Sequence, residues 1–241
     1  AQKNKLKVYW YSIGPRKSAL SLRLSALLNI PGQHNVSNAM GVYTLAEALQ
    51  VEDKPIFDTI AAYRGSWRRF EYRGQLKAIS YKLKAKVYDD YAHHPTEIKA
   101  TLSGIRQKWP KSRVVCVFQP HQAKRLSALF KEFTGAFDEA DALVLLDIYK
   151  VVGRDQMPAL NRAEVSQNVT SEELARAINR RLKKLKNLPT DKLKTVTYLP
   201  RPKKLKSVLT KFIRIHSRHS NYVIVMMGAG DIYKMTDKLV K

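Results

Sequence analysis

Short apolar runs alternate with segments of helical periodicity along the chain from about residue 85 onward. The apolar runs predict strands at 86–88, 113–118, 142–147, 195–199 and 222–227. The periodicity predicts helices at 95–109, 123–138 and 203–216, one that opens with a capping box at 170–173, and one after residue 231. Strands that alternate with helices form a largely parallel sheet covered on both faces. The alternation therefore predicts an α/β fold.

Residues 1–70 follow a different pattern. After an extended start and a turn at 30–32, we expect a helix from about residue 38 and a second helix at 54–64. The first of these helices should carry one apolar face, made of Ala39, Val42, Leu45, Ala46 and Leu49. The segment has too few strands to close a sheet, so we expect residues 1–71 to be the end of a larger domain and residues 72–241 to fold alone. Residues 1–71 should then be loosely packed, with Leu45 and Leu49 exposed.

The chain is strongly basic, with 44 Lys and Arg residues against 20 Asp and Glu residues and a formal net charge of +24. Such a charge favours anionic partners, among them nucleotides and nucleic acid. The most basic stretch is 180–218, and a nucleic-acid-binding α/β protein is therefore an alternative interpretation. The sequence has no zinc-finger, helix-turn-helix or aromatic RNA-binding signature. We accordingly expect no specific nucleic acid partner, and any DNA binding should be lost steeply with salt.

The sequence also limits the compartment and the metal chemistry. No run of about 18 apolar residues occurs, so we expect no transmembrane helix and no membrane partner. Cys116 is the single cysteine, which excludes a disulfide framework and is typical of a reducing compartment, so we expect a cytoplasmic protein. One cysteine and six scattered histidines predict no structural zinc site.

The densest polar cluster, DDYAHHPTE at 89–97, begins where a predicted strand ends and a helix follows. In open α/β sheets, ligands bind beyond the carboxyl ends of the strands. A carboxylate pair at this place can hold a ribose hydroxyl or a metal, and a histidine can contact an anion. The alternative is that Asp90 and His94 only cap the helix.

A second cluster, FQPHQAKR at 118–125, follows the next strand and puts His121 and Arg125 at the same edge of the sheet. An arginine there can bind a carboxylate or a phosphate through two hydrogen bonds, although a solvated first helical turn is the alternative. We expect this turn to lie next to the turn that carries His93, because adjacent strands lie ~4.8 Å apart and the two turns could share one ligand. Gly228 and Gly230, at the end of the last strand, allow either a close approach to a ligand or a plain strand-to-helix turn.

Two further motifs lie in the N-terminal part of the chain. Asn35 and Asn38 stand three residues apart near a helix start, where their amides can contact a purine or cap the helix. The segment WRRFE at 67–71 is a basic-aromatic turn at the expected domain boundary. No phosphate loop of the form GxxxxGKS or GxxxxGKT occurs in the sequence.

Taken in this order, the motifs resemble those of the Mur ligase family. The segment IPGQHNVSNA at 30–39 is similar to the family signature PGxHNxxNA, and RRFE at 68–71 is similar to its domain junction. The cluster at 89–97 is similar to the motif DDYxHHPTE of the alanine-adding branch, and FQPH at 118–121 and GAGDI at 228–232 also resemble that branch. The resemblance covers essentially residues 20–241.

The resemblance implies both a fold and a reaction. Residues 72–241 would be a Rossmann-like C-terminal ligase domain with a mostly parallel sheet, and residues 1–71 the tail of a truncated central ATPase domain. The family's alanine-adding enzyme uses ATP and Mg²⁺ to join UDP-N-acetylmuramate to L-alanine through an acyl phosphate. The resemblance therefore implies ATP and Mg²⁺ as cofactors and UDP-N-acetylmuramate and L-alanine as substrates.

The resemblance also implies a site. Its nucleotide-binding residues would be Asn35 and Asn38 near the adenine, with Arg69 and Asp90 on the hinge side. Its residues on the alanine and phosphate side would be His93, His121, Gln122 and Arg125, of which His93 and Arg125 would be catalytic. The family often has arginine at the position of Gln122, so a neutral amide replaces one charged contact to the anion.

The family's phosphate loop, catalytic glutamate and UDP-binding domain have no counterpart in the sequence, so the chain resembles the back half of such an enzyme. We therefore expect Mg²⁺ to be held mostly by the missing front half, and the chain alone to be inactive. The alternative is a subunit of a split ligase that binds a separate front half.

Overall fold

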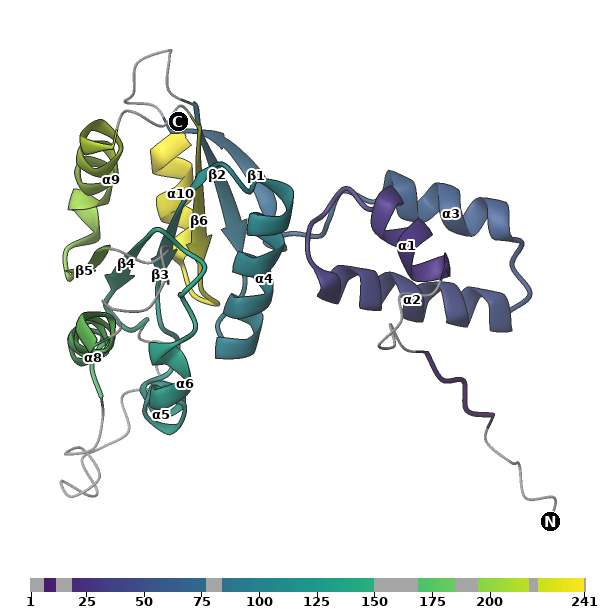
Figure 1. Cartoon of the computed structure of the whole chain (residues 1–241), viewed down its shortest axis with the longest axis horizontal. Coiled ribbons are helices and arrows are strands. Elements are labelled where there is room, and N and C mark those ends of the chain that lie inside the picture. The colour runs from purple at the N-terminus through teal and green to yellow at the C-terminus, as the bar shows by residue number, and fades with distance from the viewer. Residues whose placement is uncertain are drawn as a thin grey trace. The chain divides into compact units, whose positions relative to one another are not determined.

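The structure is a computed structural model that describes residues 7–11, 19–76, 84–149, 169–184, 195–216 and 221–240. The chain divides into two compact units, Ala1–Gly65 and Ser66–Lys241 (Figure 1). The turn at 66–70 therefore belongs to the second unit, together with the strand that follows it.

The described residues of the first unit form three helices, α1 (Ala19–Leu27), α2 (Gln33–Ala48) and α3 (Asp53–Ala62). Their shared core consists of Leu24, Ala39, Met40, Tyr43, Ile56, Phe57 and Ile60. The predicted exposure of Leu45 and Leu49 is confirmed, since these side chains are 61% and 68% exposed. The predicted apolar face of α2 is wrong in part. The helix packs against α1 and α3 through the face that carries Met40 and Tyr43, and α1 itself was not expected.

The second unit is built on a six-stranded sheet with the strand order β1-β2-β6-β3-β4-β5. The strands are β1 (Glu71–Gln75), β2 (Lys84–Asp90), β3 (Arg113–Phe118), β4 (Ala142–Leu146), β5 (Thr195–Leu199) and β6 (Asn221–Met227). All neighbouring pairs are parallel except β1 and β2, which are antiparallel. The predicted α/β fold with a mostly parallel sheet is confirmed, and β1 is an addition that the sequence did not reveal.

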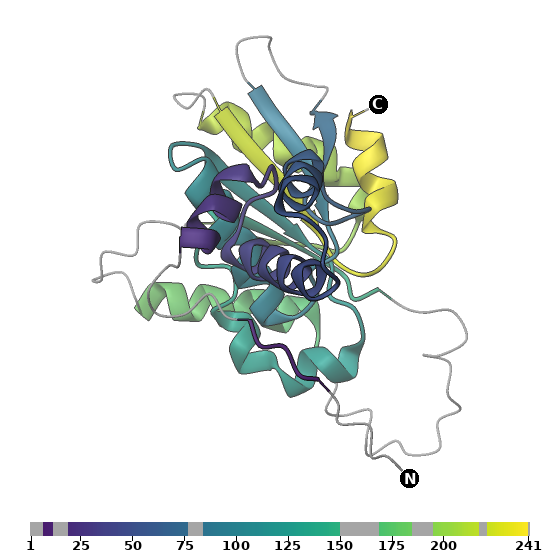
Figure 2. The same ribbon diagram turned by 90° about the vertical axis from the view of Figure 1, so that its right-hand side faces the viewer.

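Helices cover both faces of this sheet, as Figures 1 and 2 show. One face carries α4 (Pro95–Lys108), α5 (Ala123–Ala128), α6 (Phe130–Thr134) and α8 (Ser171–Lys184). The other carries the 3-10 turn η1 (Pro202–Lys204), α9 (Leu205–Ile215) and α10 (Ile232–Val240). Successive strand residues point to opposite faces, so Cys116 packs in the first core and Val117 in the second.

One predicted helix differs from the structure in detail, and the predicted start of another is confirmed. The helix expected at 123–138 is interrupted at Leu129, which has φ −112° and ends α5 before α6 begins. The break still lets Leu126 and Phe133 reach the same core, where each is 1% exposed. The capping box that opens α8 is confirmed, because the backbone N–H of Glu173 donates to the Thr170 hydroxyl at 3.1 Å and the Thr170 N–H donates to the Glu173 carboxylate at 2.7 Å.

The described residues of the basic stretch at 180–218 lie on separate elements. Residues 185–194 and 217–218 lie outside the described residues, and the described part is divided between α8 and α9, which cover opposite faces of the sheet. No helix in the described part of the chain is long and apolar enough to cross a membrane.

Candidate functional site at the carboxyl edge of the sheet

Three loops meet where β2, β6 and β3 end. The Gln119 N–H donates to the carbonyl of Met227 at 3.0 Å, and the Gly228 N–H donates to the carbonyl of Asp90 at 3.1 Å. Gly228 has φ +150°, and a Cβ at this position would lie 2.7 Å from the carbonyl oxygen of Gln119. A side chain is therefore excluded here, and the glycine lets the loops after β3 and β6 approach each other closely.

The order of these strands corrects one expectation. We expected the turns that carry His93 and His121 to lie on adjacent strands, but β6 lies between β2 and β3. Two strand spacings make the separation of the strands roughly 9.6 Å instead of ~4.8 Å. The turn at 228–230 therefore lies between the two histidine-bearing turns and is part of the same edge.

Asp90 is occupied by backbone hydrogen bonds. Its side chain is 5% exposed, and its two carboxylate oxygens accept hydrogen bonds from the N–H groups of Phe70 at 2.9 Å and Ala92 at 2.8 Å. Burial raises the pKa of Asp90, although these N–H groups and the charge of Arg69 act in the opposite direction. The carboxylate thus fastens the turn at 66–70 to the end of β2, and a role of Asp90 toward a nucleotide stays a prediction.

The other predicted nucleotide-binding residues lie on two different units. Arg69 is exposed, and its guanidinium carbon lies 5.6 Å from the centre of the Tyr91 ring. Asn35 and Asn38 lie in the first two turns of α2, in the first unit. The Asn35 amide donates to the carbonyl of Pro31 at 2.7 Å, and Asn38 is exposed. Arg69 and Asn38 are therefore accessible, while Asn35 stabilises the start of its own helix.

His93 is held by the first turn of α4. Its Nδ1 lies 3.0 Å from the carbonyl oxygen of Tyr91 and 3.3 Å from Oε2 of Glu97. The same Glu97 oxygen accepts hydrogen bonds from the N–H groups of His93 at 2.9 Å and His94 at 3.1 Å. Burial would raise the pKa of Glu97, but these N–H groups and His93 outweigh it and leave the pKa below its usual value. His94 caps α4 by accepting a hydrogen bond from the Thr96 N–H, as the capping alternative predicted.

The loop after β3 carries the remaining predicted residues. The His121 ring stacks on Tyr149, with ring centres 5.5 Å apart and an interplanar angle of 16°. Gln122 occupies the N-cap position of α5 at φ +67° without a side-chain cap hydrogen bond, and both Gln122 and Arg125 are half-buried. Nη1 of Arg125 is a buried donor with no hydrogen-bond partner among the described residues. A buried donor of this kind is costly unless an acceptor reaches it, so Arg125 fits an anionic oxygen.

Residues 68–230 match the family described as Mur ligase, glutamate ligase domain. The chain belongs to the Mur ligase family. The family resemblance inferred from the sequence motifs is thereby confirmed, and the match begins at the turn that Asp90 fastens to β2.

Individual Mur ligases are similar to most of this chain. The UDP-N-acetylmuramate–L-alanine ligase of Clostridium kluyveri is 35% identical over 219 residues, which are 91% of this chain and 40% of that protein. The enzyme of the same name from Clostridium perfringens is 46% identical over 132 residues, which are 55% of this chain and 27% of that protein. The solved UDP-N-acetylmuramate–alanine ligase of Thermotoga maritima gives a TM-score of 0.61 at 25% identity, covering 88% of this chain and 38% of its own. The chain therefore spans two fifths or less of the length of these relatives.

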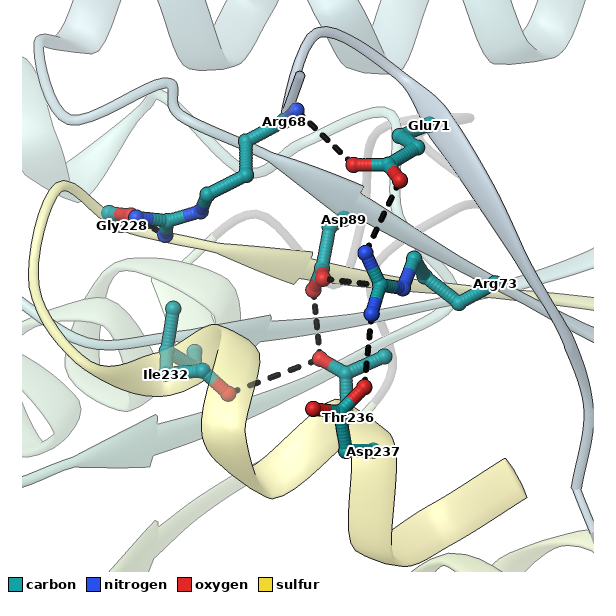
Figure 3. A network of polar contacts seen from close by, with 8 residues as sticks. All are labelled: Arg68, Glu71, Arg73, Asp89, Gly228, Ile232, Thr236 and Asp237. Carbon is teal, nitrogen blue, oxygen red and sulfur yellow. Dashed lines mark hydrogen bonds and ion pairs between the residues drawn. The ribbon is translucent and has the colours of Figure 1, made fainter. Parts of the chain in front are cut away.

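Residues that sequence reasoning did not single out contact the candidate site residues of this Mur ligase chain. Arg68 is 1% exposed, and its guanidinium donates a hydrogen bond to the carbonyl oxygen of Gly228 (Figure 3). Glu97 orients His93, and Tyr149 supports His121. The motifs contained Arg68 and Glu97, but no pattern in the sequence separates the buried Arg68 from the exposed Arg69.

The described residues differ in how well they fit the two implied cofactors. Arg69 and the unpartnered donor of Arg125 fit the anionic oxygens of a phosphate or a carboxylate. Within the described ranges, no group of three or more His, Cys, Asp or Glu residues could hold a metal ion. The part of the Mur ligase chain that the structure describes therefore offers anion contacts but no Mg²⁺ cage.

Proposed function

We propose that this chain is the C-terminal portion of an ATP-dependent UDP-N-acetylmuramate–L-alanine ligase, which adds L-alanine to the muramoyl carboxylate in the synthesis of peptidoglycan precursors. The observation that carries the proposal is the carboxyl edge of the sheet, where the motif at 89–97 holds His93 and the loop after β3 presents the unpartnered donor of Arg125. The names of the relatives from Clostridium and Thermotoga support the choice of L-alanine.

When bound, ATP would supply the phosphoryl group that activates the muramoyl carboxylate. Arg125 would hold an anionic oxygen of L-alanine or of the activated carboxylate, and Arg69 would contact a phosphate of the nucleotide. Both arginines would thereby place the amine of L-alanine close to the carbonyl carbon that it attacks. Gln122 would add a neutral hydrogen bond beside Arg125, since it carries no charge.

His93 would act on the amine. A hydrogen bond from its Nδ1 to the carbonyl of Tyr91 selects the neutral tautomer in which Nε2 is an acceptor. Nε2 would take a proton from the ammonium group of L-alanine and so free the lone pair that attacks the carbonyl carbon. His121, held against Tyr149, would line the same side of the site.

The proposal extends to the first unit and to the metal. Residues 1–71 would be the end of the central ATP-binding domain, with Asn35 and Asn38 near the adenine. Mg²⁺ would be held mostly by the part of the complete enzyme that this chain does not span, because the described residues offer it no cluster of ligands. The chain alone would then neither hydrolyse ATP nor ligate L-alanine.

A chimeric enzyme tests the proposal. Residues 20–241 would replace the matching C-terminal region of the Clostridium kluyveri ligase, and L-alanine-dependent release of phosphate from ATP would be measured. We expect activity in the chimera, none in the 241-residue chain, and an at least tenfold higher KM for L-alanine in the chimera with Arg125→Ala, while the KM for ATP changes little. Lys124→Ala, which removes a neighbouring exposed cation, is the matched control.

Three outcomes would count against parts of the proposal. ATP turnover by the purified chain would contradict the assignment of the phosphate chemistry to the missing part. A folded chimera that prefers another amino acid would reject L-alanine as the substrate. Activity that returns when the front part is supplied as a separate polypeptide, but not in the fusion, would favour the split-subunit alternative.

A further inference from the structure

Arg68 is a buried cation enclosed by aromatic rings. Its guanidinium carbon lies 5.2 Å from the centre of the Tyr91 ring, 5.0 Å from that of Tyr233 and 5.6 Å from that of Trp67. Asp89, which is 0% exposed, is one of the negative groups that stabilise its charge. Burial nevertheless lowers the pKa of Arg68, and its Nε has no hydrogen-bond partner among the described residues. A charge buried in this way adds little net stability, so its placement calls for another explanation.

One set of contacts leads from Arg68 to His93. The carbonyl oxygen of Arg68 accepts a hydrogen bond from the Tyr91 N–H at 2.7 Å, and the guanidinium lies over the Tyr91 ring. The Tyr91 ring in turn meets the His93 ring edge to face, with centres 5.4 Å apart and an interplanar angle of 84°. Arg68 thus fixes both the backbone and the ring of the residue against which His93 packs.

A second set of contacts leads from Arg68 to His121. The guanidinium donates a hydrogen bond to the carbonyl of Gly228 (Figure 3), the residue that begins the turn at 228–230. Gly230 lies directly on the Tyr149 ring, since a Cβ at Gly230 would be 2.5 Å from Cγ of that ring. Tyr149 also contacts His121, and the centres of the two stacked rings lie 5.5 Å apart. A shift of Gly228 would therefore be transmitted through Gly230 and Tyr149 to His121.

We propose that Arg68 is a positioning residue that sets the orientation of both site histidines, His93 through Tyr91 and His121 through the turn at 228–230 and Tyr149. The two histidine-bearing turns are separated by β6, so they need a common support, and Arg68 contacts both sets of residues. Only the consequence for L-alanine ligation depends on the proposed function. A planar guanidinium can lie over the Tyr91 ring with one nitrogen while another donates to Gly228, whereas the single ammonium of a lysine that donates to Gly228 has no second nitrogen to place over the ring.

The first test measures the histidine rings in the 241-residue chain by nuclear magnetic resonance. Ring signals would be assigned with single His→Gln variants, and spectra of Arg68→Gln and Arg68→Lys compared with the unaltered chain. We expect the signals of His93 and His121 to move in Arg68→Gln, while those of His34 in the first unit and His216 at the end of α9 stay in place. Arg68→Lys should return His121 toward its original position more fully than His93, because it restores the contact to Gly228 alone.

Arg73→Gln is the matched control. Arg73 belongs to the same network (Figure 3), but its ion pairs there join it to Glu71 at 2.8 Å, Asp89 at 3.7 Å and Asp237 at 2.6 Å. We expect Arg73→Gln to lower the unfolding temperature without moving the His93 or His121 signals. Histidine signals that stay in place in a folded Arg68→Gln, or that move equally in Arg73→Gln, would overturn the proposal. If Arg68→Gln does not fold, Arg68→Lys tests the proposal instead. Signals of His93 and His121 that move by unequal amounts would support it, and signals that both stay in place would overturn it.

The second test uses the chimeric ligase described above. Arg68→Gln should lower kcat by at least about tenfold and change the KM for ATP little, because misplaced catalytic groups slow the reaction of bound substrates. If the histidine signals move in Arg68→Gln but the unaltered chimera is inactive, the positioning role of Arg68 is kept and the proposed function is rejected. Unchanged kcat in Arg68→Gln would overturn the role of Arg68 in the reaction.

Discussion

The two units of the chain differ in how their apolar residues are buried. In the second unit, the sheet is covered by helices on both faces, and residues such as Leu143 and Ile224 are 0% exposed. In the first unit, three helices share one small core, and Val42, Leu45 and Leu49 are more than half exposed. A region with fewer buried apolar contacts opens at a lower free energy. The second unit therefore has the more complete core, and the first should be the weaker part of the chain.

Replacing one leucine in each unit tests this difference with the largest expected effect. Leu143→Ala in β4 should lower the free energy of unfolding by about 3–4 kcal/mol, because it leaves a cavity in a packed core. Leu45→Ala, at a side chain that is 61% exposed, should change it by less than about 0.5 kcal/mol. Urea unfolding followed by circular dichroism measures both. A Leu45→Ala cost close to that of Leu143→Ala would show that α2 is covered in solution and would remove the contrast.

The units also differ in their buried charges. In the second unit, Asp89 of β2 lies beside β1 and against α10, where it accepts a hydrogen bond from Thr236 and lies 3.7 Å from Nε of Arg73 (Figure 3). Burial raises the pKa of Asp89 from 3.8 to about 6, although Thr236, Arg73 and Arg68 oppose the shift. In the first unit, the ion pair between Lys54 and Asp58 is exposed, and such pairs contribute little.

The raised pKa of Asp89 predicts a pH dependence of the second unit. Between about pH 4 and pH 6 the folded state binds a proton that the unfolded state has lost, so the free energy of unfolding falls as the pH rises through this window. A shift of about two units corresponds to roughly 2–3 kcal/mol between the two ends of the window. Asp89→Asn should remove this contribution, and unfolding in urea at pH 4 and pH 7 measures the difference from wild type. If the free energies of unfolding of the two proteins depend on pH in the same way, the pKa of Asp89 is the same in the folded and unfolded states.

Sequence reasoning located the elements of the second unit that depend on local signals. The strand at 113–118 is a continuous apolar run, and the start of α8 is marked by Thr170 and Glu173 themselves. It did not locate β1, because this edge strand has the polar sequence EYRGQ and packs through its pairing with β2. The break at Leu129 was missed for a similar reason, since no glycine or proline marks it.

The candidate site was predicted residue by residue but not as an arrangement. The motifs named His93, His121 and Arg125, and the structure places all three on the carboxyl edge of one sheet. The strand order could not be read from the sequence, because the last strand of the chain lies in the middle of the sheet, between β2 and β3. The burial of Arg68 beside an exposed Arg69 depends on left-handed backbone conformations at residues 68 and 70, with φ +54° and +52°, which no side-chain pattern signals.

Helix caps provide the smallest contrast between the units. In the second unit, the Thr170 hydroxyl accepts a hydrogen bond from the Glu173 N–H at the start of α8. In the first unit, the N-cap residues of α2 and α3 are Gly32 and Glu52, and neither makes a side-chain cap hydrogen bond. Thr170→Ala should therefore lower the free energy of unfolding by about 1 kcal/mol. The reverse change is possible at Glu52, whose φ of −64° and ψ of 150° are those of a normal cap.

Glu52→Ser should stabilise the first unit by about 0.5 kcal/mol. This is less than a full cap contributes, because Pro55 has no N–H and the serine oxygen can accept only from the N–H of Lys54. Hydrogen exchange of amides in α3 and α8 measures each change in its own unit. Glu52→Gln, which cannot form this cap, is the matched control. If Glu52→Ser slows exchange across α1, α2 and α3 together, these helices open as one unit around the Leu24 core. If it slows exchange in α3 alone, the helices of the first unit open separately, and the shared core is too weak to couple them.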